Sequence, residues 1–293
     1  MDIHTLNAFL EVARLQSFSL AAEALFITQP AISKRIQALE EELGTPLFNR
    51  INRKVTLTEA GHALLPRVQA LRNELEDIRR IAANLSGNIR GDLVMGTSHH
   101  IGLRRLPPIL SQFNREHTAV QLDLRFVDSE QACHAVERGD LELAVVTLPN
   151  EPPAQLQAQC IWTDQLHIVV SRDHPLSQLP FVPLETLIQY RCVLPAKDTY
   201  THRIISHALA HLATALNVYI STNYLETLKM LVSAGLGWSL LPHTMLDDGL
   251  TRLNTPLNLT RELGVLYHRK RTLSNAAKAM LEMLEEESFY LHL

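Results

Sequence analysis

The spacing of apolar residues changes sharply near residues 86–91 of this 293-residue chain. Before that point apolar side chains recur at helical intervals with one short interruption, whereas after it short apolar runs alternate with helical patterns. The segment at the change contains glycines among polar residues, which is typical of a boundary between domains. The length is sufficient for about two domains. We therefore predict a helical N-terminal domain followed by a larger α/β domain.

The N-terminal segment is predicted to form three helices. The first spans residues 3–15, and either Ser17 or Ser19 can cap the second, because a serine hydroxyl accepts an otherwise unpaired backbone N–H. The third helix begins at residues 28–30, where a proline in the first turn is favourable, and ends at Gly44. Its inward face consists of Ile32, Ile36, Leu39 and Leu43.

The outward face of the third helix is polar and basic, and the chain after it has the pattern of a β-wing. Glutamine can read adenine edges, whereas lysine and serine suit guanine or phosphate. Two short extended pieces then flank a basic tip at residues 49–54, while three glutamates lie at the other end of the helix. The net charge of −4 means that any DNA contact depends on this local patch. The DNA-facing residues predicted from this pattern are Gln29, Ser33, Lys34, Arg35, Gln37, Arg50, Arg53 and Lys54.

A solvated three-helix bundle with ordinary surface charge is the alternative interpretation of this segment. The turn, the helix start and the basic wing follow one another in the order of a winged helix-turn-helix, which favours DNA binding. Residues 18–25 and 28–36, with the continuation through residues 39–44, 47–50 and 57–61, resemble the LysR-type transcriptional regulators. That resemblance implies that Thr28, Gln29, Pro30, Ser33 and Lys34 face DNA and that Arg53 lies on the wing.

A long helix is predicted to follow the wing, with Thr58 as its cap. Apolar residues recur along it at alternating intervals of four and three, the pattern of a coiled-coil seam. The alternative is an amphipathic helix that packs on its own domain. Members of the resembled family pair through such a helix and commonly form tetramers, so we expect a homo-oligomer. The seam residues are Leu64, Val68, Leu71, Leu75, Ile78, Ala82 and Leu85.

The C-terminal part begins with strands and helices in the order βαβαβ, which predicts a parallel sheet with right-handed crossovers. Near residue 162 the chain passes to a second unit, and a strand at residues 264–267 crosses back. We therefore predict an α/β, two-lobed fold that resembles periplasmic substrate-binding proteins. The expected domains are residues 1–58 (winged helix-turn-helix), 59–88 (linker helix) and 89–293 (effector-binding), with lobe 1 at about 91–162 plus 266–293 and lobe 2 at about 163–265.

Residues 138–145 and residues 231–238, followed by Leu241 and Pro242, resemble the regulatory half of LysR-type regulators. Ligands of open parallel sheets bind beyond the carboxyl ends of the strands, where helix N-termini point N–H groups inward. Each polar residue there is more often a helix cap than a ligand contact, but together they favour a small polar effector, most plausibly a carboxylate. The candidate effector residues are Thr97, Ser98, His99, Ser129, Thr147, Thr201, His202 and Asn223.

Three other functions are weaker interpretations of the same sequence. His207 and His211, four residues apart and near His202, could hold zinc or nickel in a metal-responsive regulator, but 14 histidines make such spacings common by chance. An enzyme is disfavoured because the sequence has no nucleophile elbow, no phosphate-binding glycine loop and no HExxH motif. A transport-type binding protein is disfavoured by the DNA-binding head.

Cysteine usage and the N-terminus indicate a cytoplasmic location. Cys133, Cys160 and Cys192 are widely spaced and odd in number, which argues against a disulfide framework and favours a reducing compartment. The N-terminus lacks a secretory pattern, and no apolar stretch approaches the ~20 residues that span a bilayer. We expect no cofactor and no membrane partner. Operator DNA, a small-molecule inducer and, through the family resemblance, RNA polymerase are the expected partners.

Overall fold

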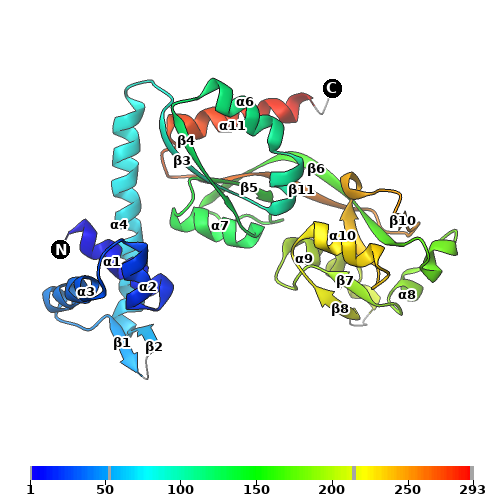
Figure 1. The fold of residues 1–293 in the computed structure, drawn as a ribbon, viewed down its shortest axis with the longest axis horizontal. Helices are drawn as coiled ribbons and strands as arrows, with labels where there is room; N and C mark the ends of the chain where they lie inside the picture. The colour runs from blue at the N-terminus through cyan, green and yellow to red at the C-terminus, as the bar shows by residue number, and fades with distance from the viewer. Residues whose placement is uncertain (1, 52–53, 213–215, 291–293) are drawn as a thin grey trace. The chain divides into compact units, whose positions relative to one another are not determined.

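The computed structural model describes residues 2–51, 54–212 and 216–290. The chain divides into two compact units, Met1–Ser86 and Gly87–Leu293, which we call unit 1 and unit 2 (Figure 1). The boundary lies within the segment where the apolar pattern changes. In the described part of the chain, no helix is both long and apolar enough to cross a membrane.

Unit 1 begins with helices α1 (Ile3–Leu15), α2 (Phe18–Ala24) and α3 (Gln29–Leu43). The Asp2 carboxylate caps α1 by accepting the Thr5 N–H at 2.7 Å, and Ser17 caps α2. Thr28 caps α3, which ends at Gly44 in the left-handed conformation that glycine tolerates. The buried core that holds the helices together includes Phe9, Phe18, Ile32, Ile36 and Leu47.

The wing consists of strands β1 (Phe48–Ile51) and β2 (Lys54–Leu57), which pair antiparallel. The Glu40 carboxylate of α3 accepts hydrogen bonds from the backbone N–H groups of Leu47 and Phe48, at 2.7 and 3.2 Å. This glutamate therefore fixes the start of the wing against the end of α3. Helix α4 (Glu59–Asn84) follows, with Thr58 as its N-cap.

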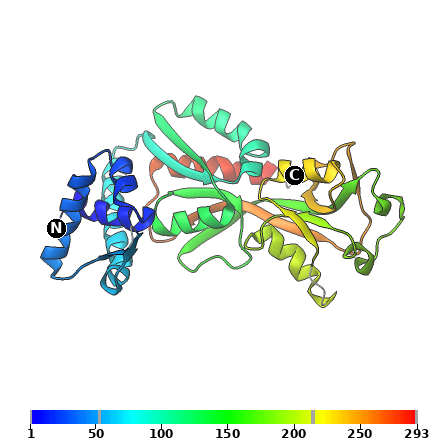
Figure 2. The ribbon, with the colours of Figure 1, turned by 60° about the horizontal axis from the view of Figure 1, so that its bottom comes forward.

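Unit 2 is built around one seven-stranded sheet within the described residues. The strands β3, β4 and β5 are parallel, as the βαβαβ pattern predicted, whereas β9, β10 and β11 run antiparallel to their neighbours. The 16-residue strand β6 pairs with β11 along both lobes (Figure 2). The strands are β3 (Gly91–Thr97), β4 (Val120–Phe126), β5 (Leu143–Thr147), β6 (Leu156–Ser171), β9 (Ser239–Pro242), β10 (Leu250–Arg252) and β11 (Leu259–His268).

Lobe 1 has helices on both faces of the sheet (Figures 1 and 2). A core cluster that includes Ile101, Phe113 and Met280 packs α5, α6 and α11 on one face, and a cluster that includes Val136 packs α7 on the other. Each helix presents an apolar stripe to the sheet, which is how two-layer packing buries both elements. The helices are α5 (His99–Arg104), α6 (Pro107–Glu116), α7 (Ser129–Arg138) and α11 (Asn275–Tyr290).

Lobe 2 surrounds the other half of β6 and the parallel pair β7 (Cys192–Leu194) and β8 (Val218–Ser221). The fully buried Trp238 lies in the cluster that packs α8 and α9, while Leu228 of α10 belongs to a second cluster. The helices and 3₁₀ turns of this lobe are Pro175–Gln178, α8 (Leu184–Leu187), α9 (Tyr200–Ala208), Ala210–Leu212, α10 (Leu225–Ser233) and His243–Met245.

The winged helix-turn-helix and the two-lobed α/β fold are confirmed, but the connection between the lobes differs from the prediction. The lobe boundaries predicted near residues 162 and 266 fall inside β6 and β11, because each of these strands runs through both lobes. Among described residues, residues 163–165 of β6 and residues 260–262 of β11 are in register with each other and with no other strand. This two-stranded waist joins the lobes.

Gly61→Ala should destabilise the protein, although alanine is ordinarily the better helix former. A Cβ on Gly61 would lie 2.3 Å from the backbone oxygen of Leu47 and 2.8 Å from Leu57 Cδ2, so the wing would have to move away from α4. We expect a loss of about 1–3 kcal/mol in the free energy of unfolding, measured by denaturant titration. The neighbouring exposed His62→Ala is the control and should change stability by under about 0.5 kcal/mol. A gain in stability for Gly61→Ala would contradict this packing.

Candidate DNA interface and inter-lobe cleft

The residues predicted to face DNA gather at the first two turns of α3. Thr28, Gln29, Pro30 and Lys34 are exposed, and Ser33 is half-buried. The Gln29 side-chain amide donates to the Ser33 hydroxyl at 3.0 Å, which holds both polar groups on one face of the helix. In a helix-turn-helix, the second of the two helices, here α3, reads the major groove with side chains at its N-terminal end.

The side chains of the other residues predicted to contact DNA differ in their exposure and in the contacts that they already make within the protein. Arg35 is half-buried, and the exposed Gln37 amide donates to the Glu41 carboxylate at 2.8 Å. On the wing, the Arg50 guanidinium lies 4.1 Å from the centre of the Phe18 ring, a cation–π contact that orients it. Lys54 is exposed, and Arg53 lies outside the described residues.

Phe26, in the turn between α2 and α3, is a surface residue that the sequence analysis did not single out. Its side chain is 96% exposed, and its backbone has a φ of +54°, the left-handed region that few non-glycine residues adopt. Phe26 does not continue the apolar repeat of the helix before it or the helix after it. That position in the sequence could have indicated that its side chain lies outside the core.

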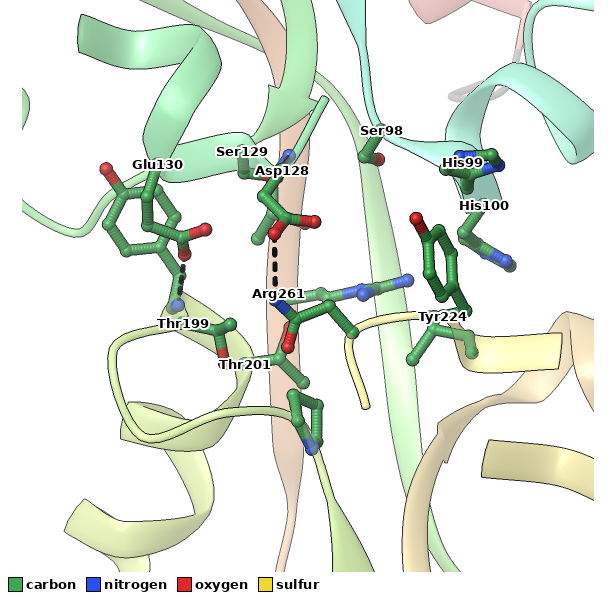
Figure 3. Close-up of a pocket in the computed structure, with 15 residues that line it drawn as sticks. Ser98, His99, His100, Asp128, Ser129, Glu130, Thr199, Thr201, Tyr224 and Arg261 are labelled. Carbon is green, nitrogen blue, oxygen red and sulfur yellow. Dashed lines mark hydrogen bonds between the residues drawn. The ribbon is translucent and has the colours of Figure 1, made fainter. Parts of the chain in front are cut away.

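A cleft lies between the two lobes of unit 2, beyond the carboxyl ends of β3, β4 and β5 (Figure 3). Its cavity volume is about 50 Å³. One water needs roughly 10–15 Å³, so the cavity fits only a few non-hydrogen atoms. The structure brings six of the predicted effector residues together here: Ser98, His99, Ser129, Thr147, Thr201 and Asn223.

The other two predicted effector residues are used by the fold. The Thr97 hydroxyl donates to the Val145 carbonyl at 2.8 Å, a bond that joins β3 to β5. The His202 Nδ1 lies 2.8 Å from the Pro195 carbonyl, so the ring is tied to its own lobe. Both side chains are buried and lie outside the residues that line the cleft.

The hydroxyl groups in the cleft fall into two kinds. Ser129 accepts the Thr147 backbone N–H at 3.1 Å and so joins α7 to β5. Ser98 is the N-cap residue of α5, but within the described structure its side chain makes no capping hydrogen bond. The Ser98 hydroxyl therefore remains available to a ligand.

Two hydrogen bonds cross the cleft from carboxylates of lobe 1 to lobe 2 (Figure 3). Asp128 accepts from the Asn223 side-chain amide at 2.8 Å, and Glu130 accepts from the Tyr200 backbone N–H at 2.5 Å. Tyr200 is the first residue of α9, where the positive end of a helix dipole favours an anion. Burial raises the pKa of Glu130, and the nearby Asp128 and Asp198 raise it further.

Arg261 is the cleft residue that the sequence analysis missed. It is only 6% exposed, and its Nε and Nη2 donate to Asp164 at 3.2 and 2.8 Å. The two residues face each other directly in the β6–β11 waist, and Arg105 donates to the same carboxylate at 2.8 Å. Burial would raise the pKa of Asp164, but the two arginines outweigh it and hold the pKa below its usual value.

His100 lies beside this ion pair and is only 4% exposed. Neither ring nitrogen has a hydrogen-bond partner among the described residues, and the nearest carboxylate oxygens, of Asp164 and Glu226, are both 3.8 Å away. Burial, together with the charge of Arg261, lowers the pKa of His100 to about 4. The ring is therefore neutral at pH 7 and can both donate and accept a hydrogen bond.

The geometry gives no support to the metal-responsive alternative. His207 and His211 do not share a helix, because α9 ends at Ala208 and His211 lies in the separate turn Ala210–Leu212. Their four-residue spacing therefore does not place the two histidines on one face of a single helix. Within the part of the chain that the structure describes, no group of three or more potential ligand residues could hold a metal ion.

The comparisons with known proteins match both units. Residues 3–62 match the family model of the bacterial regulatory helix-turn-helix protein, lysR family, and residues 86–288 match the LysR substrate binding domain. The transcriptional activator CmpR of Synechocystis is 27% identical over 292 residues, which cover 96% of this chain and 94% of CmpR.

Solved structures show the same fold. A full-length OxyR variant from Pseudomonas aeruginosa has a TM-score of 0.66 at 21% identity, over 98% of this chain and 94% of that one. Full-length CbnR in complex with its target DNA has a TM-score of 0.62 at 18% identity, over 99% of each chain. Because the two family models together span most of its length, this chain belongs to the LysR family of transcriptional regulators, which bind DNA through a helix-turn-helix domain and carry an effector-binding domain.

Proposed function

We propose that this regulator responds to a small carboxylate bound between the lobes of unit 2 and that the bound ligand changes its affinity for operator DNA. The observation that carries the proposal is the buried Arg261 on the cleft wall. Arg261 and Arg105 share the single carboxylate of Asp164, which leaves the local charge positive. A ligand carboxylate would balance that charge and accept from the Ser98 hydroxyl.

The two bonds that cross the cleft support a mechanism based on lobe closure. They hold lobe 1 against lobe 2 around a cavity of about 50 Å³, too small for a bulky ligand. A larger effector would separate the lobes, whereas a small effector would form hydrogen bonds to both lobes and so hold them together. Either change alters the geometry of unit 2, and a ligand shifts such an equilibrium by its difference in affinity for the two states.

Thiol-based sensing is a less favourable mechanism for this chain. Burial is the main factor that raises the pKa of Cys133, Cys160 and Cys192, the last to about 12. A reactive cysteine needs the thiolate form, which a raised pKa suppresses. We propose a non-enzymatic regulator that acts in the cytoplasm, where it meets operator DNA and, for activation, RNA polymerase.

We further propose that the chain assembles through the C-terminal half of α4. Leu64 and Val68 pack against the core of unit 1, so the start of the predicted seam is occupied within the same domain. Leu71, Ile78 and Leu85 are 43%, 55% and 84% exposed in the single chain. Apolar residues repeated along an exposed helix are stabilised by a second helix in a coiled coil, which fits a dimer or a dimer of dimers.

Lys34→Ala should weaken binding to all DNA sequences and reduce the slope of log affinity against log salt by about one, because one phosphate or base contact is lost. Gln29→Ala should instead change the preference among sites by about 1–3 kcal/mol. Fluorescence anisotropy on DNA selected from a random library measures both effects. Lys278→Ala, an exposed lysine of unit 2, is the charge-matched control. Unchanged binding by both α3 variants would refute the interface.

Leu71→Asp should halve the oligomer mass in light scattering, because an unpaired carboxylate in a dry seam costs several kcal/mol. The same variant should lose affinity for DNA with two half-sites while it retains weak binding to one. Leu179→Asp is the control, since Leu179 in lobe 2 is also 43% exposed. If the Leu71 variant assembles as the parent protein does, the oligomer forms through a surface other than α4.

Ser98→Ala with Thr201→Ala should leave operator affinity unchanged and remove the effect of the inducer on it. The measurement is a thermal-shift screen of small carboxylates on the full chain, repeated on the double variant. Ser111→Ala, on the exposed side of α6, is the control and should respond like the parent protein. A carboxylate whose thermal shift survives in the double variant would place the effector outside the cleft.

A further inference from the structure

Charged residues of both signs line the cleft, since Asp128 and Glu130 are acidic and Arg261 is basic (Figure 3). We infer that the effector is zwitterionic and that its ammonium group lies against Asp128 and Glu130 while its carboxylate lies against Arg261. The inference rests on the proposed function, since it specifies the ligand of the same cleft. An amino acid or a similar small molecule with one positive and one negative group is the class of ligand that this arrangement fits.

The acidic wall is formed by the N-terminal end of α7. Asp128 occupies the N-cap position, yet among the described residues its side chain does not cap the helix and instead extends across the cleft to Asn223. Glu130, in the first turn of the helix, is directed to the same side. Each carboxylate has two oxygens, and the bonds to Asn223 and Tyr200 use one oxygen of each. The remaining oxygens can accept from an ammonium group.

The same wall excludes a second anion. The start of α9, which would otherwise attract a ligand carboxylate, is already occupied by Glu130 through the Tyr200 N–H. Burial is the main cause that raises the pKa of Glu130, and the negative charges of Asp128 and Asp198 raise it further. A ligand cation would partly neutralise these carboxylates, whereas a ligand anion on this side would be repelled.

The opposite wall has the donors that a carboxylate requires. Arg261 supplies positive charge, and the Ser98 hydroxyl is not used in capping. His100 lines the cavity, is almost fully buried and has both ring nitrogens without a partner in the described structure. A buried polar group without a hydrogen bond is costly, so a ligand oxygen that accepts from the neutral ring would remove that cost.

The cavity volume limits the size of this ligand. A cavity of about 50 Å³ suits a molecule of a few non-hydrogen atoms. A larger side chain would have to extend toward the exposed Tyr224 and His99 at the cleft edge, whose rings lie 4.7 Å apart. Small zwitterions should therefore bind without displacement of the two bonds that cross the cleft.

The test measures binding of matched ligands to the full chain by isothermal titration and thermal shift. The probes are the twenty protein amino acids, β-alanine, 4-aminobutyrate and glycine betaine. For each hit, the same molecule without its amino group and without its carboxyl group is measured beside it; for alanine these are propionate and ethylamine. We expect the zwitterion to bind on the order of 10- to 100-fold more tightly than either one-charge analogue.

Asp128→Asn keeps the shape of the side chain and removes its charge. It should abolish the preference for the zwitterion over the deaminated acid, and a cooperative thermal transition checks that the variant is folded. Glu130→Gln should reduce the preference in the same direction and can still accept from the Tyr200 N–H. The control is Asp173→Asn, an exposed carboxylate of lobe 2, which should retain the full preference.

Three outcomes would overturn the inference. The first is that no zwitterion in the set binds, and the second is that the deaminated acid binds as tightly as its parent. The third is a preference for the zwitterion that persists in the Asp128→Asn, Glu130→Gln double variant. The second outcome, with binding that is lost in the Ser98→Ala, Thr201→Ala variant, leaves the proposed carboxylate response intact. Binding that persists in all these cleft variants would refute the proposed function as well.

Discussion

The pairing of β6 with β11 is the interaction on which unit 2 depends. These strands run through both lobes, and lobe 1 adds β5 to one side of the pair while lobe 2 adds β9 and β10 to the other. Both hydrophobic cores of each lobe include or contact residues of these strands. Because the lobes share one hydrogen-bonded sheet, the cleft between them has a continuous backbone floor.

The two-stranded waist of this sheet also holds the ion pair that lies at the cleft. Asp164 and Arg261 are cross-strand neighbours, so their side chains project from the same face at the point where the lobes meet. A buried arginine is tolerated there because a carboxylate partner lies directly opposite, and Arg105 adds a second positive charge from the end of α5. The ion pair thus contributes to the fold and to the electrostatic field that a ligand would meet.

The sequence predicts best those elements whose ends carry local signals. Thr28 and Gly44 delimit α3, as their capping signals predicted. The length of β6 was not predictable, since its first half mixes polar and apolar residues and its pairing depends on β11, about 100 residues later in the chain. Arg261 was missed because it lies mid-strand, whereas Thr97 and His202 have the expected position but bond to the backbone.

The bulge between Leu263 and Gly264, where the register of β11 against β6 shifts, has a consequence for motion. A Cβ at Gly264 would lie 2.0 Å from the Gln159 carbonyl oxygen, so the strands approach there more closely than any side chain permits. Lobes joined by flexible loops would swing freely, but lobes joined by a two-stranded ribbon move mainly by twisting it. A ligand that changed the angle between the lobes would therefore have to twist this β-ribbon, and the stiffness of the ribbon would limit how far one lobe could turn against the other.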